Sequence, residues 1–148
     1  MKTLLEKTTQ DEVVRRISAL TEENRAEWGK MKLHQMLRHC ILFEEMIAGK
    51  KKYKRSFIGI LFGRMALKSI LKGDKPLGRN SPTLREFKVK ETGDDLEALK
   101  REWIGMLEDY AKLPASGFVH PFFGKITKDQ IGYFSYKHAD HHLRQFKA

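Results

Sequence analysis

Cysteine is nearly absent from this 148-residue chain, which contains only Cys40. One thiol cannot form an internal disulfide, so the chain does not belong to the disulfide-stapled class of small secreted domains. The first residues, MKTLLEKTTQDEVVRR, also lack the uninterrupted apolar stretch that a signal peptide needs. From these two absences we expect a cytoplasmic protein.

Long apolar runs and alternating strand patterns are also missing. The longest apolar run, at residues 56–71, is interrupted by Arg64 and Lys68, whereas a helix that spans a bilayer needs about 20 apolar residues. Alternation typical of a strand occurs only weakly, in REFKVKE at residues 85–91. We therefore predict no membrane span and an all-α protein, with residues 1–148 forming a single domain.

Acidic residues are almost absent from one internal segment. Residues 50–79 carry ten Lys or Arg side chains against the single acid Asp74, so this segment supplies +9 of the net charge of +10. The chain before residue 50 has eight basic and eight acidic residues, and the chain after residue 79 has eleven and ten. Because no nucleic-acid readout motif accompanies this charge, we expect a small anionic substrate and do not expect nucleic acid.

Four segments carry apolar residues at the spacing of amphipathic helices: about 10–20, 31–48, 95–113 and 127–146. Their ends are marked by residues that start or stop helices, namely Thr9, Asp94 and Thr127 at starts and Gly49 and Pro114 at ends. Four such helices imply a four-helix bundle. The long interval between the second and third helices predicts a crossover that includes an extra basic helix, about 57–72, capped by Ser56.

Three of the six histidines lie within YKHADHHLRQF at residues 136–146. At about 100° per residue, His138 and His142 project within about 20° of the inward direction set by Ile131. His141 lies on the flank of this stripe, and Asp140 faces the opposite way, toward solvent. A spacing of four residues stacks two imidazoles on one helix face, where both can reach one metal ion.

Two interpretations of this pair compete at this stage. Core histidines are often simply hydrogen-bonded, whereas a metal site needs at least one further ligand from another helix. The second predicted helix offers His34 and His39. His39 lies at the edge of the apolar sector of that helix, so its geometry favours it over His34.

Three stretches of the chain resemble the DinB-like (YfiT-like) superfamily, in particular a subfamily without an assigned function. They are EWGKMKLHQMLRHC at 27–40, PLGRNSPT at 76–83 and HPFFGKITKDQIGYFSYKHADHHLRQF at 120–146. The resemblance covers nearly the whole chain. It implies a four-helix bundle with a long crossover and a divalent metal held by three histidines, which correspond to His39, His138 and His142. His141 and His120 are additional to the pattern. Whether either of them joins the site stays open.

Three imidazole ligands leave a position on the metal for water or substrate. The ion, expected to be zinc or nickel, would acidify water or hold a thiol as thiolate, and the sequence leaves the catalytic side chains unknown. The resemblance implies a low-molecular-weight thiol S-transferase, with such a thiol as a second cofactor, or a metal-dependent hydrolase. The alternative is a noncatalytic, metal-stabilised binding protein whose basic crossover docks on an anionic partner. Whether the protein forms a homodimer stays open.

Several other side chains invite a functional interpretation. Cys40 lies near the middle of an apolar face, which favours a packed and inert thiol. His120 precedes a proline in an aromatic-rich turn, and a structural role is favoured there. Trp28 is expected in the core because of its size. Glu44 and Glu45 are candidates to orient a ligand imidazole through its second nitrogen.

Overall fold

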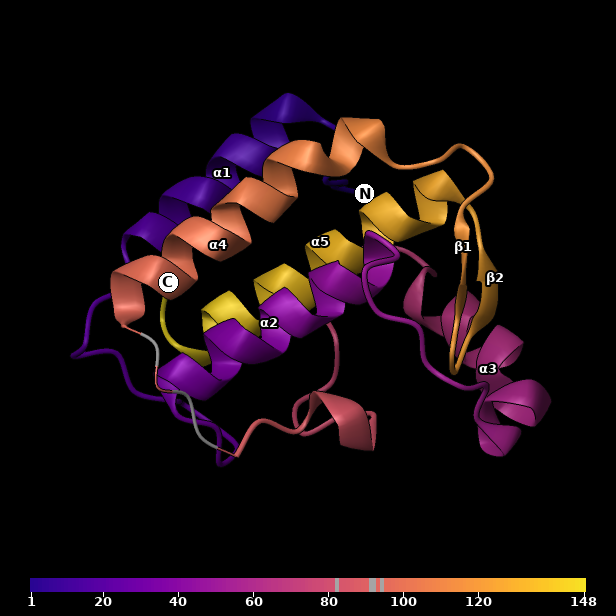
Figure 1. Cartoon of the computed structure of the whole chain (residues 1–148), viewed down its shortest axis with the longest axis horizontal. Coiled ribbons are helices and arrows are strands. Elements are labelled where there is room, and N and C mark those ends of the chain that lie inside the picture. The colour runs from indigo at the N-terminus through magenta and orange to yellow at the C-terminus, as the bar shows by residue number, and fades with distance from the viewer. Residues whose placement is uncertain (82, 91–92, 94) are drawn as a thin grey trace.

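The computed structural model describes residues 1–81, 83–90, 93 and 95–148 (Figure 1). These residues form mainly helices and one small sheet: α1 (Lys7–Ser18), α2 (Leu33–Ile47), α3 (Phe57–Ile70), α4 (Leu96–Glu108), β1 (Phe118–His120), β2 (Gly124–Ile126) and α5 (Lys128–Gln145). Two short 3-10 turns, Arg85–Phe87 and Asp109–Lys112, complete the regular structure of this part of the chain. The predominantly helical class is confirmed, and the small sheet is an addition to the prediction.

Four of the helices pack around a common core. Helix α4 packs along both α2 and α1, and α5 contacts α1 and α2 (Figure 1). The completely buried side chains between them include Leu37, Ile41, Trp103, Leu107 and Leu143. Each such side chain contributes about 1.5–3 kcal/mol through removal of apolar surface from water. This core fixes the relative positions of α2 and α5, which carry the histidines.

Two predicted helix starts are confirmed by their capping hydrogen bonds. At α5, the Gln130 N–H donates to Thr127 Oγ1 at 3.3 Å, and the Thr127 N–H donates to Gln130 Oε1 at 3.1 Å. At α3, the Gly59 N–H donates to Ser56 Oγ at 3.3 Å. Both caps satisfy N–H groups that have no partner within the helix.

The predicted start of the first helix is wrong. Helix α1 begins at Lys7, and Thr9, the predicted cap, lies buried within its first turn. The reason is tertiary: Leu4 is completely buried and its N–H donates to the Gly132 carbonyl at 3.1 Å. The Gln10 Nε2 then donates to the Leu4 carbonyl at 2.7 Å, which holds the chain in place just before the helix.

The start of α4 differs in detail from the prediction. Asp94, the predicted cap, lies outside the described residues. Asp95 acts as the N-cap, because its side chain accepts a hydrogen bond of 2.8 Å from the Ala98 N–H. The helix ends at Glu108 and continues as a 3-10 turn to Lys112. The predicted stop before Pro114 therefore holds, with a tighter last turn.

A hairpin that the sequence did not predict leads into α5. Strands β1 and β2 are antiparallel, with Phe118 opposite Ile126 and His120 opposite Gly124. The only segment with a weak strand pattern, 85–91, instead forms a 3-10 turn at Arg85–Phe87, and its last residue lies outside the described residues. The hairpin matters for the fold because α3 packs against β2.

Helix α3 is tied to α5 by a buried lysine. Lys137 Nζ donates to the carbonyls of Ile70, Gly73 and Lys75 at 2.7, 2.7 and 3.0 Å. These carbonyls lie at the end of α3 and just beyond it, where helices leave acceptors without partners. The predicted extra helix is therefore present between α2 and α4, and it is anchored. In the described part of the chain, no helix combines the length and the apolar character required to cross a membrane.

Candidate metal centre

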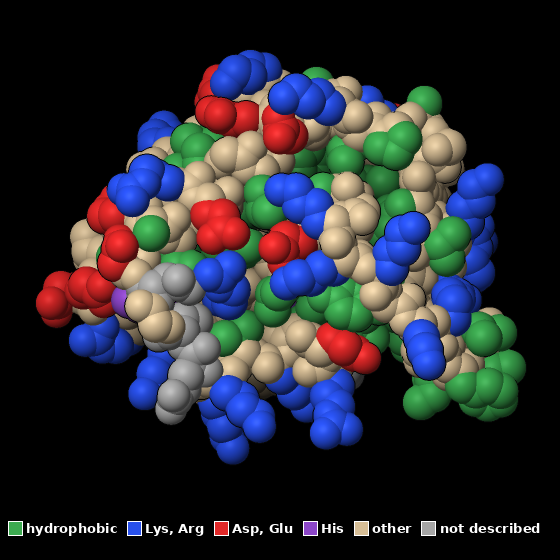
Figure 2. Space-filling model, viewed as in Figure 1, with side chains coloured by type: hydrophobic (Ala, Val, Ile, Leu, Met, Phe, Trp, Pro, Cys, Tyr) green, Lys and Arg blue, Asp and Glu red, His purple; other side chains and the backbone are tan. Residues whose placement is uncertain are grey.

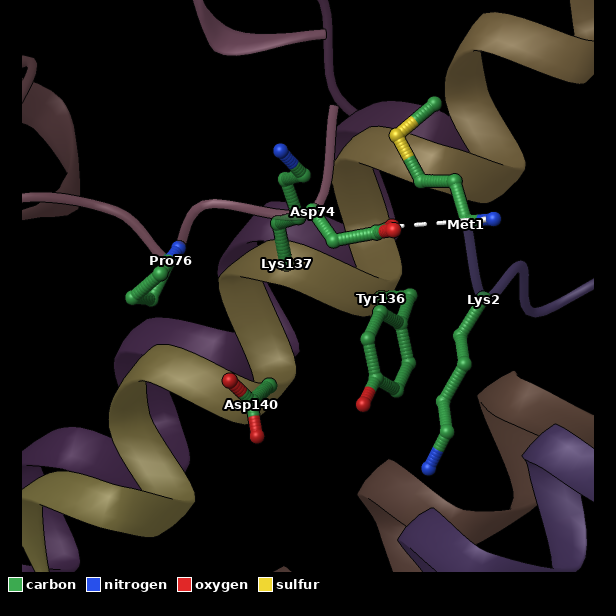
Figure 3. Close-up of a pocket in the computed structure, with 7 residues that line it drawn as sticks. All are labelled: Met1, Lys2, Asp74, Pro76, Tyr136, Lys137 and Asp140. Carbon is green, nitrogen blue, oxygen red and sulfur yellow. Dashed lines mark ion pairs between the residues drawn. The ribbon is translucent and has the colours of Figure 1, made fainter. Parts of the chain in front are cut away.

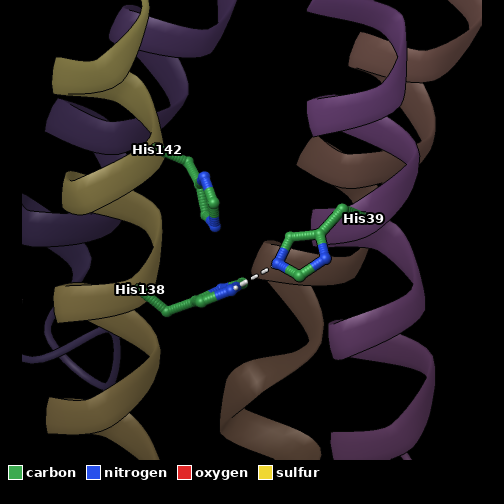
Figure 4. Close-up of side chains that lie close together, drawn as sticks. All are labelled: His39, His138 and His142. Atoms are coloured by element: carbon green, nitrogen blue, oxygen red, sulfur yellow. Dashed lines mark hydrogen bonds between the residues drawn. The ribbon is translucent and has the colours of Figure 1, made fainter. Parts of the chain in front are cut away.

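Three histidines from two helices meet between α2 and α5. His138 and His142 project from α5 toward His39 on α2 (Figure 4). One ring nitrogen from each of the three lies within 4.8 Å of the others, and the Nε2 atoms of His39 and His138 are 3.1 Å apart. His39 and His142 are 3% and 6% exposed, whereas His138 is partly exposed. The cluster is thus buried except on the side of His138.

Aromatic side chains surround the cluster. The Phe43 ring lies against His138 with a centroid distance of 4.1 Å and an interplanar angle of 30°. The Phe87 ring meets His39 edge to face at 6.1 Å. Because these rings exclude water, the imidazole nitrogens must find their partners within the protein or on a bound species.

The tautomer of His39 follows from its second nitrogen. His39 Nδ1 lies 3.0 Å from the Phe87 carbonyl oxygen. A carbonyl oxygen can only accept, so Nδ1 carries the proton and donates it. The Nε2 atom therefore presents a lone pair to the other two rings. This is the arrangement in which a metal-ligating histidine donates its other N–H to a backbone carbonyl.

The tautomer of His142 follows from a short relay. Gln145 Nε2 donates to the Trp28 carbonyl at 2.8 Å, which fixes the orientation of the amide. The opposite amide atom, Gln145 Oε1, lies 3.0 Å from His142 Nδ1 and accepts its proton. His142 Nε2 is then also an unprotonated nitrogen. Two of the three rings are thus fixed with their Nε2 lone pairs toward the centre of the cluster.

The histidines are held in their neutral form. Burial lowers the pKa of His138 well below its ordinary value, and the neighbouring histidines lower it further. Burial, with a smaller contribution from His39, lowers the pKa of His142 to about 3. The pKa of His39 is also lowered by burial. Neutral imidazole is the ligating form, so the cluster needs no deprotonation at neutral pH to bind a cation.

This donor set fits a divalent transition metal. Two imidazole nitrogens on one tetrahedral ion at about 2.1 Å each lie about 3.4 Å apart, close to the observed separation of His39 and His138. The nitrogen ligands suit zinc and nickel, among other first-row ions. Because all three ligands would be neutral, the bound ion would keep its full charge. Such a centre favours an anion in the position that the protein leaves open.

Three histidines lie outside the cluster, and two of them are on the same helices as the cluster. His34 Nε2 pairs with Glu22 at 3.0 Å on the other side of α2. The His141 ring packs edge to face on Trp28, with a centroid distance of 5.6 Å. The geometry thus brings together His39 and the α5 pair, as the angular argument favoured. That these three bind a metal stays a prediction.

His120 has the structural role that the sequence favoured. Its Nδ1 accepts hydrogen bonds from the Phe122 and Phe123 N–H groups, at 3.0 and 3.2 Å. Its ring stacks on Phe123 with a centroid distance of 4.5 Å. These contacts close the turn between β1 and β2. Among the described residues, His120 does not join the group of nitrogens around His39.

The expected roles of the two glutamates do not match their contacts. Glu44 is buried and accepts a hydrogen bond of 2.5 Å from the Tyr110 hydroxyl. Glu45 forms an ion pair of 2.6 Å with Lys51. The second nitrogens of the histidines are held by a backbone carbonyl and by Gln145 instead. Cys40 is completely buried, and burial raises the pKa of its thiol well above the ordinary value, so the packed thiol is confirmed.

Asp140 faces away from the histidines, as predicted, yet it is not simply solvated. It forms an ion pair of 2.9 Å with Arg16, which links α5 to α1, and another of 3.0 Å with Arg144 within α5. Asp140 also borders an open surface pocket on this side of α5, together with Tyr136 and the chain terminus at Met1 (Figure 3). None of the three clustered histidines lines that pocket. The pocket and the histidine cluster are therefore separate sites.

Sequence reasoning missed two parts of the site. Gln145 follows His142 by three residues, so helix spacing alone could have identified it as a neighbour. The Phe87 carbonyl comes from the segment between α2 and α4, 48 residues after His39. No local pattern points to such a backbone acceptor, because it is placed by the path of that segment.

Comparison with known proteins identifies the family and little more. Residues 1–148 match a family described as a protein of unknown function (DUF1569), and the chain belongs to that family. No curated protein and no solved structure matches the chain at a significant level. The function must therefore be argued from the geometry of the site.

Proposed function

We propose that this protein is a divalent-metal-dependent enzyme in which His39, His138 and His142 hold one zinc or nickel ion. We further propose that α1, α2, α4 and α5 form a four-helix bundle of the DinB-like superfamily, with the segment between α2 and α4 as its long crossover. The mutual packing of these four helices supports that interpretation. The matched family itself carries no stated function.

One observation carries the proposal. The Nδ1 atoms of His39 and His142 lie against the Phe87 carbonyl and Gln145 Oε1, both acceptors, at 3.0 Å each. Both Nε2 lone pairs are therefore directed into a buried space that already contains the Nε2 of His138. With His138 in the tautomer that leaves its Nε2 unprotonated, a divalent cation satisfies three converging lone pairs at once.

The one thiol of the chain is poorly suited to catalysis, which disfavours a reaction through a cysteine nucleophile. Cys40 is completely buried with a raised pKa, so it is not a thiolate at neutral pH. We therefore assign the role of nucleophile to water or to a small thiol, either of which could bind at the open position of the ion. The ion supplies Lewis acidity that activates either one. We therefore propose a low-molecular-weight thiol S-transferase or a hydrolase.

The surrounding residues supply orientation and shielding. Phe43 and Phe87 exclude water from one side of the histidines, which strengthens electrostatic interactions there. The partial exposure of His138 marks the side from which a small molecule would enter. The basic crossover, which carries +9 of the net charge, would raise the local concentration of an anionic substrate or thiol.

A turnover assay on metal-loaded protein tests this proposal. The full chain is stripped with a chelator, reloaded with zinc or nickel, and supplied either with L-cysteine and monochlorobimane or with p-nitrophenyl acetate. We expect metal-dependent turnover of one of these pairs above the uncatalysed rate. It should be lost in His142→Ala and kept in His141→Ala, the matched control whose ring packs on Trp28.

The outcomes separate the candidate functions. Loss of turnover in His142→Ala alone would support catalysis by the cluster. Equal turnover in both variants would place the activity elsewhere. A protein that binds metal stoichiometrically and turns over neither pair would favour the noncatalytic binding protein.

A further inference from the structure

Helix α3 exposes the kind of side chains that proteins normally bury. Six of its large apolar side chains are between 52% and 75% exposed: Phe57, Ile58, Ile60, Leu61, Phe62 and Met65. We call these six residues the α3 patch. They form a group at the lower right of the space-filling view, over α3 at the margin of the molecule (Figure 2). Single exposed apolar residues are common, but a contiguous group of this kind marks an interaction surface.

The buried face of α3 is formed by glycines, which explains why its apolar residues point outward. Gly59 and Gly63 lie directly on the turn of the hairpin. A Cβ atom at Gly59 would stand 2.4 Å from the Phe122 carbonyl oxygen, and one at Gly63 would stand 2.0 Å from it. Leu67 continues the same face and is 2% exposed. A larger side chain cannot take the place of these glycines, so α3 cannot rotate to bury the patch.

Hydrogen bonds to the hairpin hold this orientation. The Ser56 N–H donates to the Pro121 carbonyl at 2.9 Å, at the start of the helix. Arg55 Nη1 donates to the His120 carbonyl at 2.9 Å, and Arg64 Nη1 donates to the Lys125 carbonyl at 2.6 Å. The exposed apolar face is therefore a fixed feature of the fold.

Positive charge flanks the α3 patch on both sides. Before it, the run KKKYKR at residues 50–55 contains five basic residues, and Lys50, Lys52 and Lys54 are exposed. After it, Lys68, Lys72 and Lys75 are exposed. Apolar residues bordered by lysines are the pattern of a helix that lies in the interface of an anionic bilayer.

We propose that the α3 patch and its flanking lysines dock the protein on the surface of an anionic membrane, with α3 lying in the plane of the interface. A second copy of the chain would also cover the apolar side chains. A dimer through α3 would, however, bring together two segments that each carry +9, and this repulsion opposes it. An anionic bilayer satisfies the apolar and the basic residues together. This inference is independent of the proposed chemistry at the histidines.

Vesicle sedimentation of the full chain tests the proposal. The protein is mixed with phosphatidylcholine vesicles, with or without about 30% phosphatidylserine. We expect binding only to the anionic vesicles, weakened on the order of tenfold or more at about 0.5 M NaCl. The variant Leu61→Ser/Met65→Ser removes apolar contacts from exposed positions, so its helical content should be unchanged. It should bind the anionic vesicles on the order of tenfold more weakly.

A matched pair of charge variants separates local from net charge. Lys68→Glu/Lys72→Glu and Arg15→Glu/Arg101→Glu change the net charge equally, and all four residues are exposed. The first pair flanks the α3 patch, whereas the second lies on α1 and α4. Vesicle binding should be lost in the first variant and kept in the second, since each lysine at an anionic surface contributes about fivefold in affinity.

Three results would overturn the proposal. One is the absence of binding to anionic vesicles. Another is equal loss of binding in the two charge variants. The third is a dimer in sedimentation analysis that Leu61→Ser/Met65→Ser dissociates while vesicle binding stays the same.

Discussion

The histidine cluster and the α3 patch are two regions with inverted burial. Between α2 and α5, His39 and His142 are almost completely buried, although imidazole is polar. On α3, Phe57 and Met65 are 75% and 67% exposed, although both are apolar. Each region departs from the usual distribution of residues, and each is held in place by specific hydrogen bonds. Such departures are expected where a protein meets a ligand or a surface.

The two regions differ in what would complete them. The cluster directs the Nε2 lone pairs of His39 and His142 toward its centre, so it calls for a small cation. The α3 patch presents apolar surface between lysines, so it calls for an extended anionic surface. A metal ion would be bound inside the core and would add to the stability of the folded chain, whereas an anionic surface would cover side chains that lie outside the core.

The largest expected effect is metal-linked stabilisation. A divalent ion that binds only the folded chain at about a thousand times its Kd should raise the free energy of unfolding by about 4 kcal/mol. Urea unfolding with zinc and with EDTA measures this difference. The increment should vanish in His39→Ala and persist in His34→Ala, a control on the same helix whose ring pairs with Glu22. An increment that persists in both variants would place the ion elsewhere.

The next effect is the pH dependence of the free energy of unfolding that arises from the buried Glu44. Burial raises the pKa of Glu44 from 4.5 to about 7. The folded state therefore holds this proton where the unfolded chain releases it, so stability is lost as pH rises from about 4.5 to about 7. The loss should approach about 3 kcal/mol relative to Glu44→Gln, whose amide does not titrate.

Urea unfolding of the wild type and of Glu44→Gln at several pH values measures this difference. The lowered histidine pKa values act with the opposite sign, but they are common to both proteins and cancel in the comparison. A difference that stays constant between pH 5 and pH 8 would mean that Glu44 is not protonated in the folded state.

The smallest expected effect is the change in the free energy of unfolding caused by a glycine substitution in α3. Gly63→Ala would place a Cβ against the backbone of Phe122, which cannot move aside as a side chain can. We expect destabilisation of about 1–3 kcal/mol. Gly105→Ala is the matched control, because Gly105 lies in α4 with nothing within 4 Å of an added Cβ. That change should stabilise the protein by about 0.5–1 kcal/mol. Equal effects in thermal unfolding would show that α3 does not pack on the hairpin.

Local chemistry predicted the parts of the fold that depend on neighbouring residues. The capping box of Thr127 and Gln130 and the cap at Ser56 follow from short-range hydrogen bonds, and both are present. The start at Thr9 failed because a distant contact between Leu4 and Gly132 positions the chain. The hairpin escaped prediction because each strand has three residues, too few for an alternating pattern.

The same distinction between local and long-range contacts applies to the histidine cluster and the α3 patch. Helical periodicity placed His138 and His142 on one inward face, since that argument needs only the spacing within α5. It did not foresee that the Phe87 carbonyl orients His39, which depends on the path of the crossover. Hydropathy does not identify the buried face of α3, because Gly59 and Gly63 pack closely without being large and apolar. Packing through small residues does not produce a stripe of large apolar residues in the sequence, so helical periodicity does not reveal it.

Native mass spectrometry of the intact chain tests the central claim most directly. The wild-type protein, reloaded with zinc or nickel after chelation, should carry one divalent ion per chain. His142→Ala should carry none, because two imidazoles do not retain the ion, and His141→Ala should still carry one. If His142→Ala keeps its ion while His141→Ala loses it, or if the wild-type chain binds no ion, the histidine cluster is not a metal site.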